Sequence, residues 1–234
     1  MRVYVQGHPI ELRLTGEVRP TVFSLFLANG MKVSEGDRLA CDLGCGGGIL
    51  AVTLALLGVQ EVVAIDRSEA ACVLAAENAH RNGVGDRVEV IHGELSELGP
   101  DRDFDLVVSN PPTMPDGPQT PGFAAASGAS GQTFVSLLTD GLASWLGSSG
   151  RAQVALSSLA AADVLESLSA VGFAARSQAT LLAPFRNFYA AVYDSDEVDR
   201  FVADGLAVAN GESVDAGLSE FITVYELTAA AARG

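Results

Sequence analysis

From residue 38 onward, short apolar runs alternate with segments that repeat apolar positions at helical spacing. Apolar runs of this length, bounded by polar turn residues, are typical of buried strands. We predict strands at residues 38–43, 61–65, 87–91, 104–109, 152–157, 174–182 and 221–228, and helices at 48–57, 68–81, 132–146 and 161–171. Strands separated by helices at this spacing predict an α/β fold, with a mostly parallel sheet covered on both faces.

Three segments do not follow this order. Apolar and polar residues alternate on both sides of Gly7, which predicts a β-hairpin, and a helix is expected from about Thr21 to Gly30. Residues 113–131 form a loop rich in Pro, Gly, Ala and Ser, and its length indicates a functional role. An insertion is expected near 184–218, with a helix-like stretch at 198–208.

A glycine-rich loop connects the first strand of the predicted sheet to the next helix. Gly44, Gly46 and Gly48 form a Gly-x-Gly-x-Gly pattern, whereas the dinucleotide pattern Gly-x-Gly-x-x-Gly would need a glycine where Ile49 stands. Asp42 precedes the first glycine by two residues. Its carboxylate could accept from an ammonium group, but it would repel a pyrophosphate. The loop therefore disfavours a nicotinamide dehydrogenase.

Acidic residues also follow the next two predicted strands. Asp66 ends one of them, where a carboxylate can bind both hydroxyls of a ribose. Gly93-Glu94-Leu95 follows the other, where an adenine edge would lie. Taken singly, Asp66 could be a turn residue and Glu94 a surface acid. At successive strand ends beside the glycine loop, they favour a nucleotide-containing ligand.

The segment Leu39 to Gly48, with Asp66, Glu94 and Asn110-Pro111-Pro112-Thr113, resembles the class I S-adenosylmethionine (SAM)-dependent methyltransferases over about residues 35–230. The resemblance implies a Rossmann-like, seven-stranded sheet with an antiparallel last strand, and SAM as the cofactor. It implies that the glycine loop passes the methionine part of SAM, with Asp66 on the ribose and Glu94 near the adenine. The expected cofactor residues are Asp42, Gly44, Cys45, Gly46, Asp66, Arg67, Glu94, Leu95 and Asn110.

Asn110-Pro111-Pro112 resembles the fourth motif of that family in its Asn-Pro-Pro-Tyr form, which is typical of enzymes that methylate planar nitrogens. The Asn110 side-chain oxygen and the Pro111 carbonyl can accept hydrogen bonds from N–H groups, which orients the nitrogen and favours charge on it during attack. We therefore expect Asn110 and Pro111 to be catalytic. Two prolines after an asparagine could instead form a plain rigid turn.

Thr113 stands where that motif has an aromatic residue that stacks on the substrate. This departure weakens the case for a nucleobase and leaves amide, amine and oxygen acceptors open. The expected substrate residues are Asn110, Pro112, Thr113 and Phe23.

The stretch from Glu17 to Ser24 resembles the element before the glycine loop in release-factor glutamine methyltransferases, through Arg19-Pro20. An equally good interpretation is a helix start capped by Thr21. We expect residues 1–34 to form an extension, hairpin plus helix, that packs over the cofactor site of a methyltransferase domain at 35–234.

Charge and composition narrow the classes of substrate and cofactor that we expect this protein to bind. The 234 residues carry a formal net charge of -15 with no run of basic residues, which opposes a nucleic-acid substrate. The three cysteines do not suggest a disulfide framework, and the three histidines are too dispersed for a metal site. No stretch has the length of a membrane span or the pattern of a signal peptide, so we expect a cytoplasmic protein.

These features predict a SAM-dependent N-methyltransferase acting on a small molecule or a protein side chain. One alternative is an RNA or DNA base N-methyltransferase, which Asn110-Pro111-Pro112 permits and the missing aromatic opposes. Another is a non-catalytic partner subunit with the same fold. The intact glycine loop and Asn110 argue against that alternative.

Overall fold

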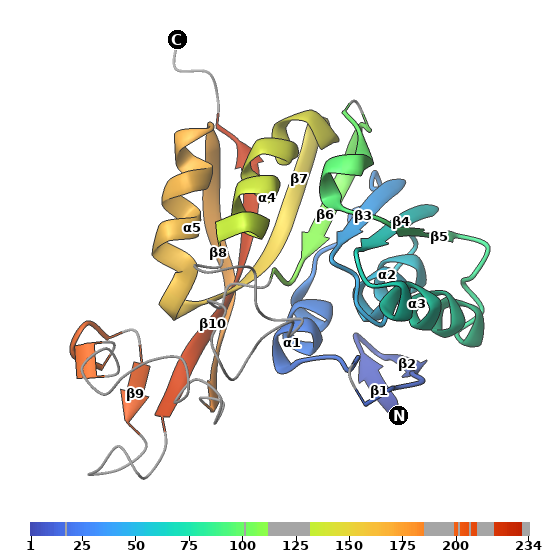
Figure 1. The fold of residues 1–234 in the computed structure, drawn as a ribbon, viewed down its shortest axis with the longest axis horizontal. Coiled ribbons are helices and arrows are strands. Elements are labelled where there is room, and N and C mark those ends of the chain that lie inside the picture. The colour runs from blue at the N-terminus through green and yellow to red at the C-terminus, as the bar shows by residue number, and fades with distance from the viewer. Residues whose placement is uncertain are drawn as a thin grey trace.

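The computed structural model describes residues 1–16, 18–100, 102–111, 132–184, 199–200, 202–205, 207–209 and 218–230. Its main sheet contains β3 (Leu39–Leu43), β4 (Glu61–Asp66), β5 (Val88–His92), β6 (Phe104–Ser109), β7 (Leu146–Ser157), β8 (Phe173–Pro184) and β10 (Leu218–Ala229). The strand order is β5-β4-β3-β6-β7-β10-β8, and only β10 runs antiparallel to its neighbours on this path. The predicted, mostly parallel seven-stranded sheet is confirmed (Figure 1).

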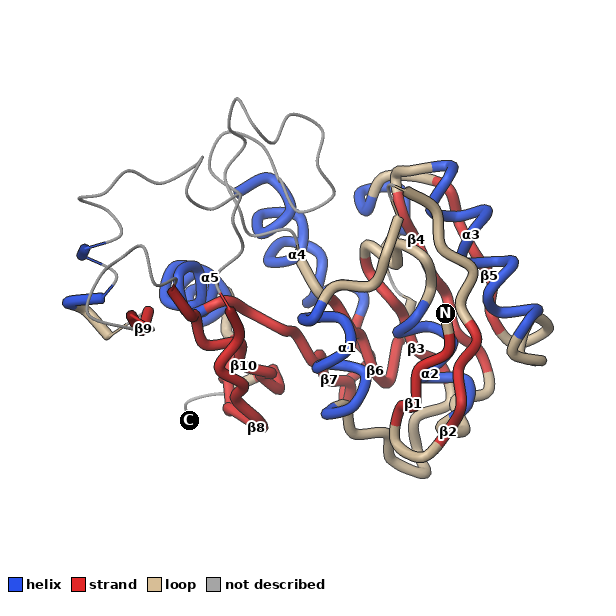
Figure 2. The backbone as a smooth tube through the Cα atoms, turned by 90° about the horizontal axis from the view of Figure 1, so that it is seen from below, coloured by secondary structure: helices blue, strands red, loops and turns tan. Residues whose placement is uncertain are grey.

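Helices cover both faces of this sheet (Figures 1 and 2). One face carries α1 (Val22–Gly30), α2 (Ile49–Leu56) and α3 (Glu69–Arg81), and the other carries the 3-10 helix η1 (Leu95–Leu98), α4 (Gln132–Trp145) and α5 (Ser158–Ala170). Alternate strand residues face opposite sides. On β4, Val62 and Ala64 therefore pack with α2, whereas Val63 and Ile65 pack in the other core. No helix in the described part of the chain is long and apolar enough to cross a membrane.

The N-terminal segment is joined to the sheet at two places. The predicted hairpin is confirmed as β1 (Arg2–Val5) and β2 (His8–Glu11), a separate antiparallel pair whose buried apolar residues join the core beneath α2. After α1, the backbone of Lys32 exchanges hydrogen bonds of 2.9 and 2.7 Å with the Gln153 side chain on β7. The two connections place residues 1–34 against the face that carries α2.

Two stretches differ from the sequence-based prediction. β7 begins at Leu146, directly after α4, rather than at residue 152, because Leu146 pairs with Phe104 of β6 and the pairing resumes at Arg151 after a register shift. The expected helix at 198–208 is helical only at 199–200 and 202–203 among its described residues, and Ala207–Ala209 form β9, which pairs with β10. Pairing with a neighbouring strand outweighs the local sequence pattern in both stretches.

Candidate cofactor and acceptor site

The glycine loop lies at the carboxyl end of β3 and is tied to the end of β4. The backbone N–H groups of Gly44 and Cys45 donate to the Ile65 carbonyl at 2.9 and 3.0 Å. Gly44, Gly46 and Gly48 have φ values of +72°, +51° and +79°, in the left-handed region that favours glycine. A Cβ on Gly46 would meet no atom within 4 Å, so none of the described residues fills the space beside it.

Gly48 is the loop position where an added methyl group should be most disruptive. It caps α2, and a Cβ there would lie 3.0 Å from both Cα and Cβ of Ala75 on α3. Gly48→Ala should lower the free energy of unfolding by about 2–4 kcal/mol, from backbone strain plus overlap. Gly83→Ala is the matched control, because its φ is +70° but its Cβ would meet nothing within 4 Å. If urea unfolding shows that both variants lose the same free energy of unfolding, the expected overlap with Ala75 is contradicted.

Asp66 holds the middle of the loop from the end of β4. Its Oδ2 accepts from the Gly46 N–H at 2.8 Å, and its Oδ1 accepts from the Ser68 N–H at 2.9 Å. The side chain is partly exposed. Because each carboxylate oxygen can accept a second hydrogen bond, Asp66 can bind a diol while it holds the loop.

Asp42 lies beneath the loop and is fully buried. Its Oδ2 accepts from the Ala51 N–H on α2 at 3.0 Å, whereas Oδ1 has no partner in the described structure. Burial raises the pKa of Asp42 from 3.8 to about 7, against the opposing effect of the Ala51 hydrogen bond. A direct contact with an ammonium group stays a prediction, and it would need the loop to open around Asp42.

Cys45 turns its side chain toward α3. A thiol hydrogen bond with Cys72 is the largest cause that raises the pKa of Cys45, and the same contact lowers the pKa of Cys72 to about 7. The Cys72 Sγ also donates to the carbonyls of Asp66 and Ile91 at 3.3 and 3.5 Å. Because its thiol interacts with Cys72 on α3, cofactor binding by Cys45 stays a prediction.

The residues expected near an adenine lie after β4 and β5. Gly93 donates its N–H to the Asp66 carbonyl at 3.0 Å, which brings the two strand ends together. Glu94 caps η1 in a reciprocal capping box with Glu97, and Leu95 is buried in the core under α4. Arg67 is exposed beside Asp66. Adenine binding by this group stays a prediction.

Asn110 follows β6 and contacts the start of α1. Its Nδ2 donates to Thr21 Oγ1 at 3.2 Å and to Ser24 Oγ at 3.0 Å. Ser109 fixes the strand end from within the core, because its Oγ donates to the Leu43 carbonyl at 2.9 Å. β3 and β6 are neighbours with Leu43 opposite Ser109, so Asn110 lies at the same sheet edge as the glycine loop. Pro111, the second expected catalytic residue, is buried there.

The expected substrate residues are only partly described. Phe23 lies on α1, partly buried against the core beneath α2. Pro112 and Thr113 lie outside the described residues, as does the rest of the loop to residue 131. The predicted cap is confirmed, because Thr21 Oγ1 accepts from the Ser24 N–H at 3.2 Å at the start of α1.

Asn78 is a loop-supporting residue that the sequence reasoning did not single out. It is 1% exposed on the inner side of α3. Its Nδ2 donates to the Gly47 carbonyl at 2.8 Å, and its Oδ1 accepts from the Arg13 N–H at 2.7 Å. The available signal was an amide in the apolar stripe formed by Ala71, Leu74 and Ala75. Asn78 therefore joins the N-terminal segment to the glycine loop.

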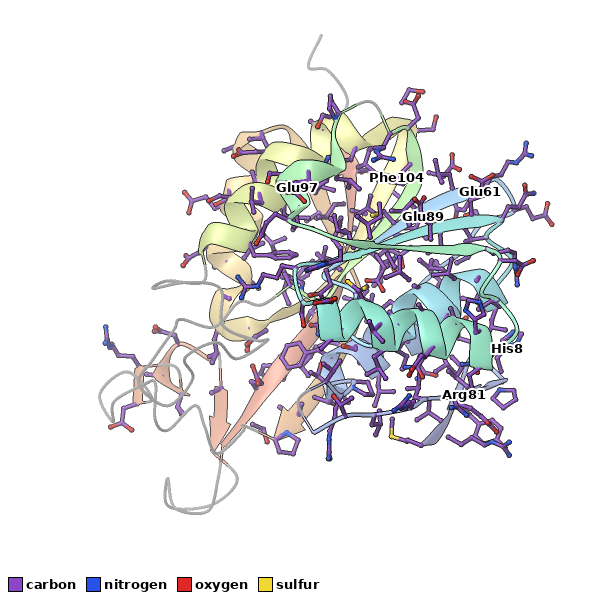
Figure 3. The ribbon with its side chains drawn as sticks, turned by 45° about the vertical axis from the view of Figure 1, so that its right-hand side comes forward. His8, Glu61, Arg81, Glu89, Glu97 and Phe104 are labelled. Carbon is purple, nitrogen blue, oxygen red and sulfur yellow. The ribbon has the colours of Figure 1, made fainter. Side chains whose placement is uncertain are left out.

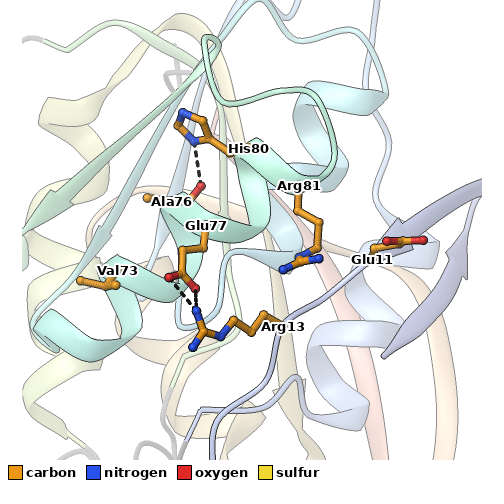
Figure 4. Close-up of a pocket in the computed structure, with 7 residues that line it drawn as sticks. All are labelled: Glu11, Arg13, Val73, Ala76, Glu77, His80 and Arg81. Carbon is orange, nitrogen blue, oxygen red and sulfur yellow. Dashed lines mark hydrogen bonds and ion pairs between the residues drawn. The ribbon is translucent and has the colours of Figure 1, made fainter.

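Two surface hollows of the described structure lie away from this edge. One is formed by the outer side of α3 and the end of β2, where Arg13 pairs with Glu77 at 2.8 Å (Figure 4). The loop contacts the inner side of the same helix. A second lies at the amino ends of β4 and β5, near Glu61 and Glu89 (Figure 3). Neither coincides with the glycine loop or Asn110.

Comparison with known proteins connects this geometry to an enzyme class. Residues 15–111 match the family model described as Ribosomal protein L11 methyltransferase (PrmA). A ribosomal protein L11 methyltransferase from Desulforamulus reducens is 42% identical over 78 residues, which cover 33% of this chain and 25% of that protein. A release factor glutamine methyltransferase from Geobacter sulfurreducens is 36% identical over 143 residues, which cover 56% of this chain and 50% of that protein.

The fold has a solved counterpart as well. The arsenic (III) S-adenosylmethionine methyltransferase CrArsM from Chlamydomonas reinhardtii matches with a TM-score of 0.56 at 16% identity, covering 87% of this chain and 67% of that one. The matched segments span only a quarter to a half of the two curated relatives. The expected resemblance is confirmed: the chain has the fold of the class I SAM-dependent methyltransferases, and part of its sequence is related to methyltransferases of ribosomal protein L11 and of release factors.

Proposed function

We propose that this chain is a SAM-dependent methyltransferase that modifies a nitrogen of a protein side chain. The observation that carries the proposal is the position of Asn110 beside a glycine loop held by Asp66, at one edge of the sheet. The names of both curated relatives refer to protein substrates, which favours a protein over a small molecule. The net charge of -15 disfavours a nucleic acid.

The residues of the loop suit SAM. The space beside Gly46 is open, and Asp66, which accepts from the Gly46 N–H, offers two carboxylate oxygens next to it. Among the described residues, the buried Oδ1 of Asp42 has no hydrogen-bond partner, as expected of a group that completes its hydrogen bonds when a cation binds. SAM would supply a methyl group on a positively charged sulfur.

The role of the chain is to position the acceptor nitrogen. Asn110 Oδ1 and the Pro111 carbonyl oxygen would accept its N–H groups and aim its lone pair at the methyl carbon. With SAM bound, methyl transfer would exchange its C–S bond for a C–N bond, and the acceptor nitrogen would release a proton to solvent. No strong base is required, because both oxygens stabilise the positive charge that develops on the nitrogen.

Asp66→Ala should weaken SAM binding about 100-fold, through loss of the ribose contacts and of the Gly46 tether. Calorimetry with SAM measures the effect, and the melting temperature checks that the variant is folded. Asp86→Ala is the charge-matched control, because Asp86 is exposed at the amino ends of the strands. Unchanged affinity in Asp66→Ala would remove the basis for this cofactor site.

Methyl transfer from radiolabelled SAM tests the acceptor class. Purified ribosomal protein L11 and a purified release factor are offered separately, and mass spectrometry locates the methyl group. We expect label on a side-chain nitrogen of one of them. Label that enters ribosomal RNA or DNA instead, or SAM binding without any transfer, would overturn the proposed protein N-methyltransferase.

We also propose that residues 1–34 pack over the cofactor site of a domain at 35–234, with an insertion near 184–218, and that the protein is cytoplasmic. Asn78 supports the first point by joining Arg13 to Gly47. Val18 supports it too, because its Cγ1 is 3.6 Å from the position of a Cβ on Gly47.

A further inference from the structure

Two hydroxyl groups of the N-terminal segment hold the Asn110 side chain. Its Nδ2 carries two hydrogens, and the two acceptors within reach are Thr21 Oγ1 at 3.2 Å and Ser24 Oγ at 3.0 Å. The hydroxyls lie 3.2 Å apart, so one of them also donates a hydrogen bond to the other. Asn110 follows Thr21 by 89 positions in the chain, so this arrangement depends on the tertiary fold.

The consequence concerns the Asn110 amide oxygen. When both N–H groups of a planar amide are directed at one pair of acceptors, its carbonyl points to the other side. Oδ1 is therefore directed away from α1, where it can accept from an incoming N–H. If the Asn110 amide were rotated by 180°, its own N–H groups would face the N–H groups of the methyl acceptor. Two hydrogen-bond donors repel each other, so the rotated amide would not orient the acceptor nitrogen.

We propose that Thr21 and Ser24 are positioning residues that keep the Asn110 oxygen turned toward the methyl acceptor. This inference rests on the proposed N-methyltransferase function. The inference gives α1 a role in selecting methyl acceptors that carry an N–H group. The reason is that the Asn110 side chain then presents only its oxygen, a hydrogen-bond acceptor, to the substrate.

Helix capping alone does not account for both hydroxyls. Thr21 caps α1 by accepting from the Ser24 N–H at 3.2 Å. The Ser24 hydroxyl takes no part in that cap, and its side-chain partners are Thr21 and Asn110. Ser24→Ala therefore removes one hydrogen bond to Asn110 and leaves the cap in place.

The test uses the full chain in the variants Ser24→Ala, Thr21→Val, their combination, and Thr21→Ser as the conservative rescue. Thr139→Val is the matched control, because the Thr139 hydroxyl donates only to the Val135 carbonyl within α4. The first readout is the NMR signal of the Asn110 side-chain amide, identified by its loss in Asn110→Asp. We expect its protons to exchange with water at least about 10-fold faster in the double variant.

The second readout is methyl transfer to the protein acceptor. In the double variant, kcat should fall about 100-fold with little change in SAM affinity, since small misplacements at a reacting centre have effects of that order. Thr21→Ser should restore most of the activity lost in Thr21→Val. Unchanged amide exchange, or faster exchange with normal kcat, overturns the positioning role. A wild-type chain that transfers no methyl group overturns the proposed function instead, and amide exchange still decides whether the two hydroxyls hold Asn110.

Discussion

Asn110→Ala should lower kcat for methyl transfer about 1,000-fold while SAM affinity stays within about 3-fold of wild type. The variant removes the oxygen that would orient the acceptor nitrogen, but it leaves the glycine loop and its Asp66 tether intact. The loss should appear in kcat rather than in KM alone, because the hydrogen bond strengthens as positive charge develops on the nitrogen.

Single-turnover transfer from labelled SAM measures this effect, with calorimetry for SAM binding. Asn29→Ala is the matched control, because Asn29 is exposed on α1 and, among the described residues, its side chain bonds to Gln6 and Leu25. If Asn110→Ala turns over at a normal rate, the positioning mechanism is wrong. If it loses SAM affinity to the same extent as turnover, Asn110 acts on the cofactor site and not on the acceptor.

Asp42→Asn should stabilise the protein at pH 8 by up to about 4 kcal/mol, an upper bound from the rise in pKa from 3.8 to about 7. At pH 8 the wild-type carboxylate is charged and fully buried, with Oδ1 unpaired. Asparagine can still accept from the Ala51 N–H but carries no charge. If Asp42 also meets the ammonium group of SAM, the same variant should bind SAM more weakly.

The pH dependence gives the sign of the effect. Between about pH 4 and pH 7, the unfolded chain releases the Asp42 proton while the folded chain keeps it. Wild-type stability due to this group therefore falls as pH rises through that window and is level above it. The advantage of Asp42→Asn should be near zero at pH 4 and reach its maximum above pH 7.

Urea unfolding at several pH values measures this difference. Asp37→Asn is a control for which the opposite change in stability is expected, because Asp37 is also buried but pairs with Arg151 at 2.7 Å. It should destabilise the protein at pH 8 by about 3 kcal/mol, since it removes one partner of a buried ion pair. A destabilised Asp42→Asn at pH 8 would mean that the Asp42 charge has a partner within the folded chain.

Local sequence determined the elements of this fold. The apolar run at 61–65 predicted a buried strand, and the pleat of that strand places Val63 and Ile65 on one face of the sheet and their neighbours on the other. The helix starts were readable because Thr21 and Ser68 each cap a backbone N–H three residues onward. The Gly-x-Gly-x-Gly pattern placed the loop at the end of β3, since the left-handed φ values there favour glycine.

The tertiary structure decided how those elements pair and pack against one another. Pairing with β6 extended β7 to Leu146, and pairing with β10 made a strand of Ala207–Ala209, because interstrand hydrogen bonds are not encoded in a local window. Asn110 was foreseeable as a motif residue, but its contacts with α1 arise only when distant segments meet. The sequence by itself predicted which residues carry chemistry. The packing determined their burial, and with it the raised pKa of Asp42 and the side of Asn110 that faces an acceptor, because desolvation and hydrogen-bond direction depend on neighbours in space.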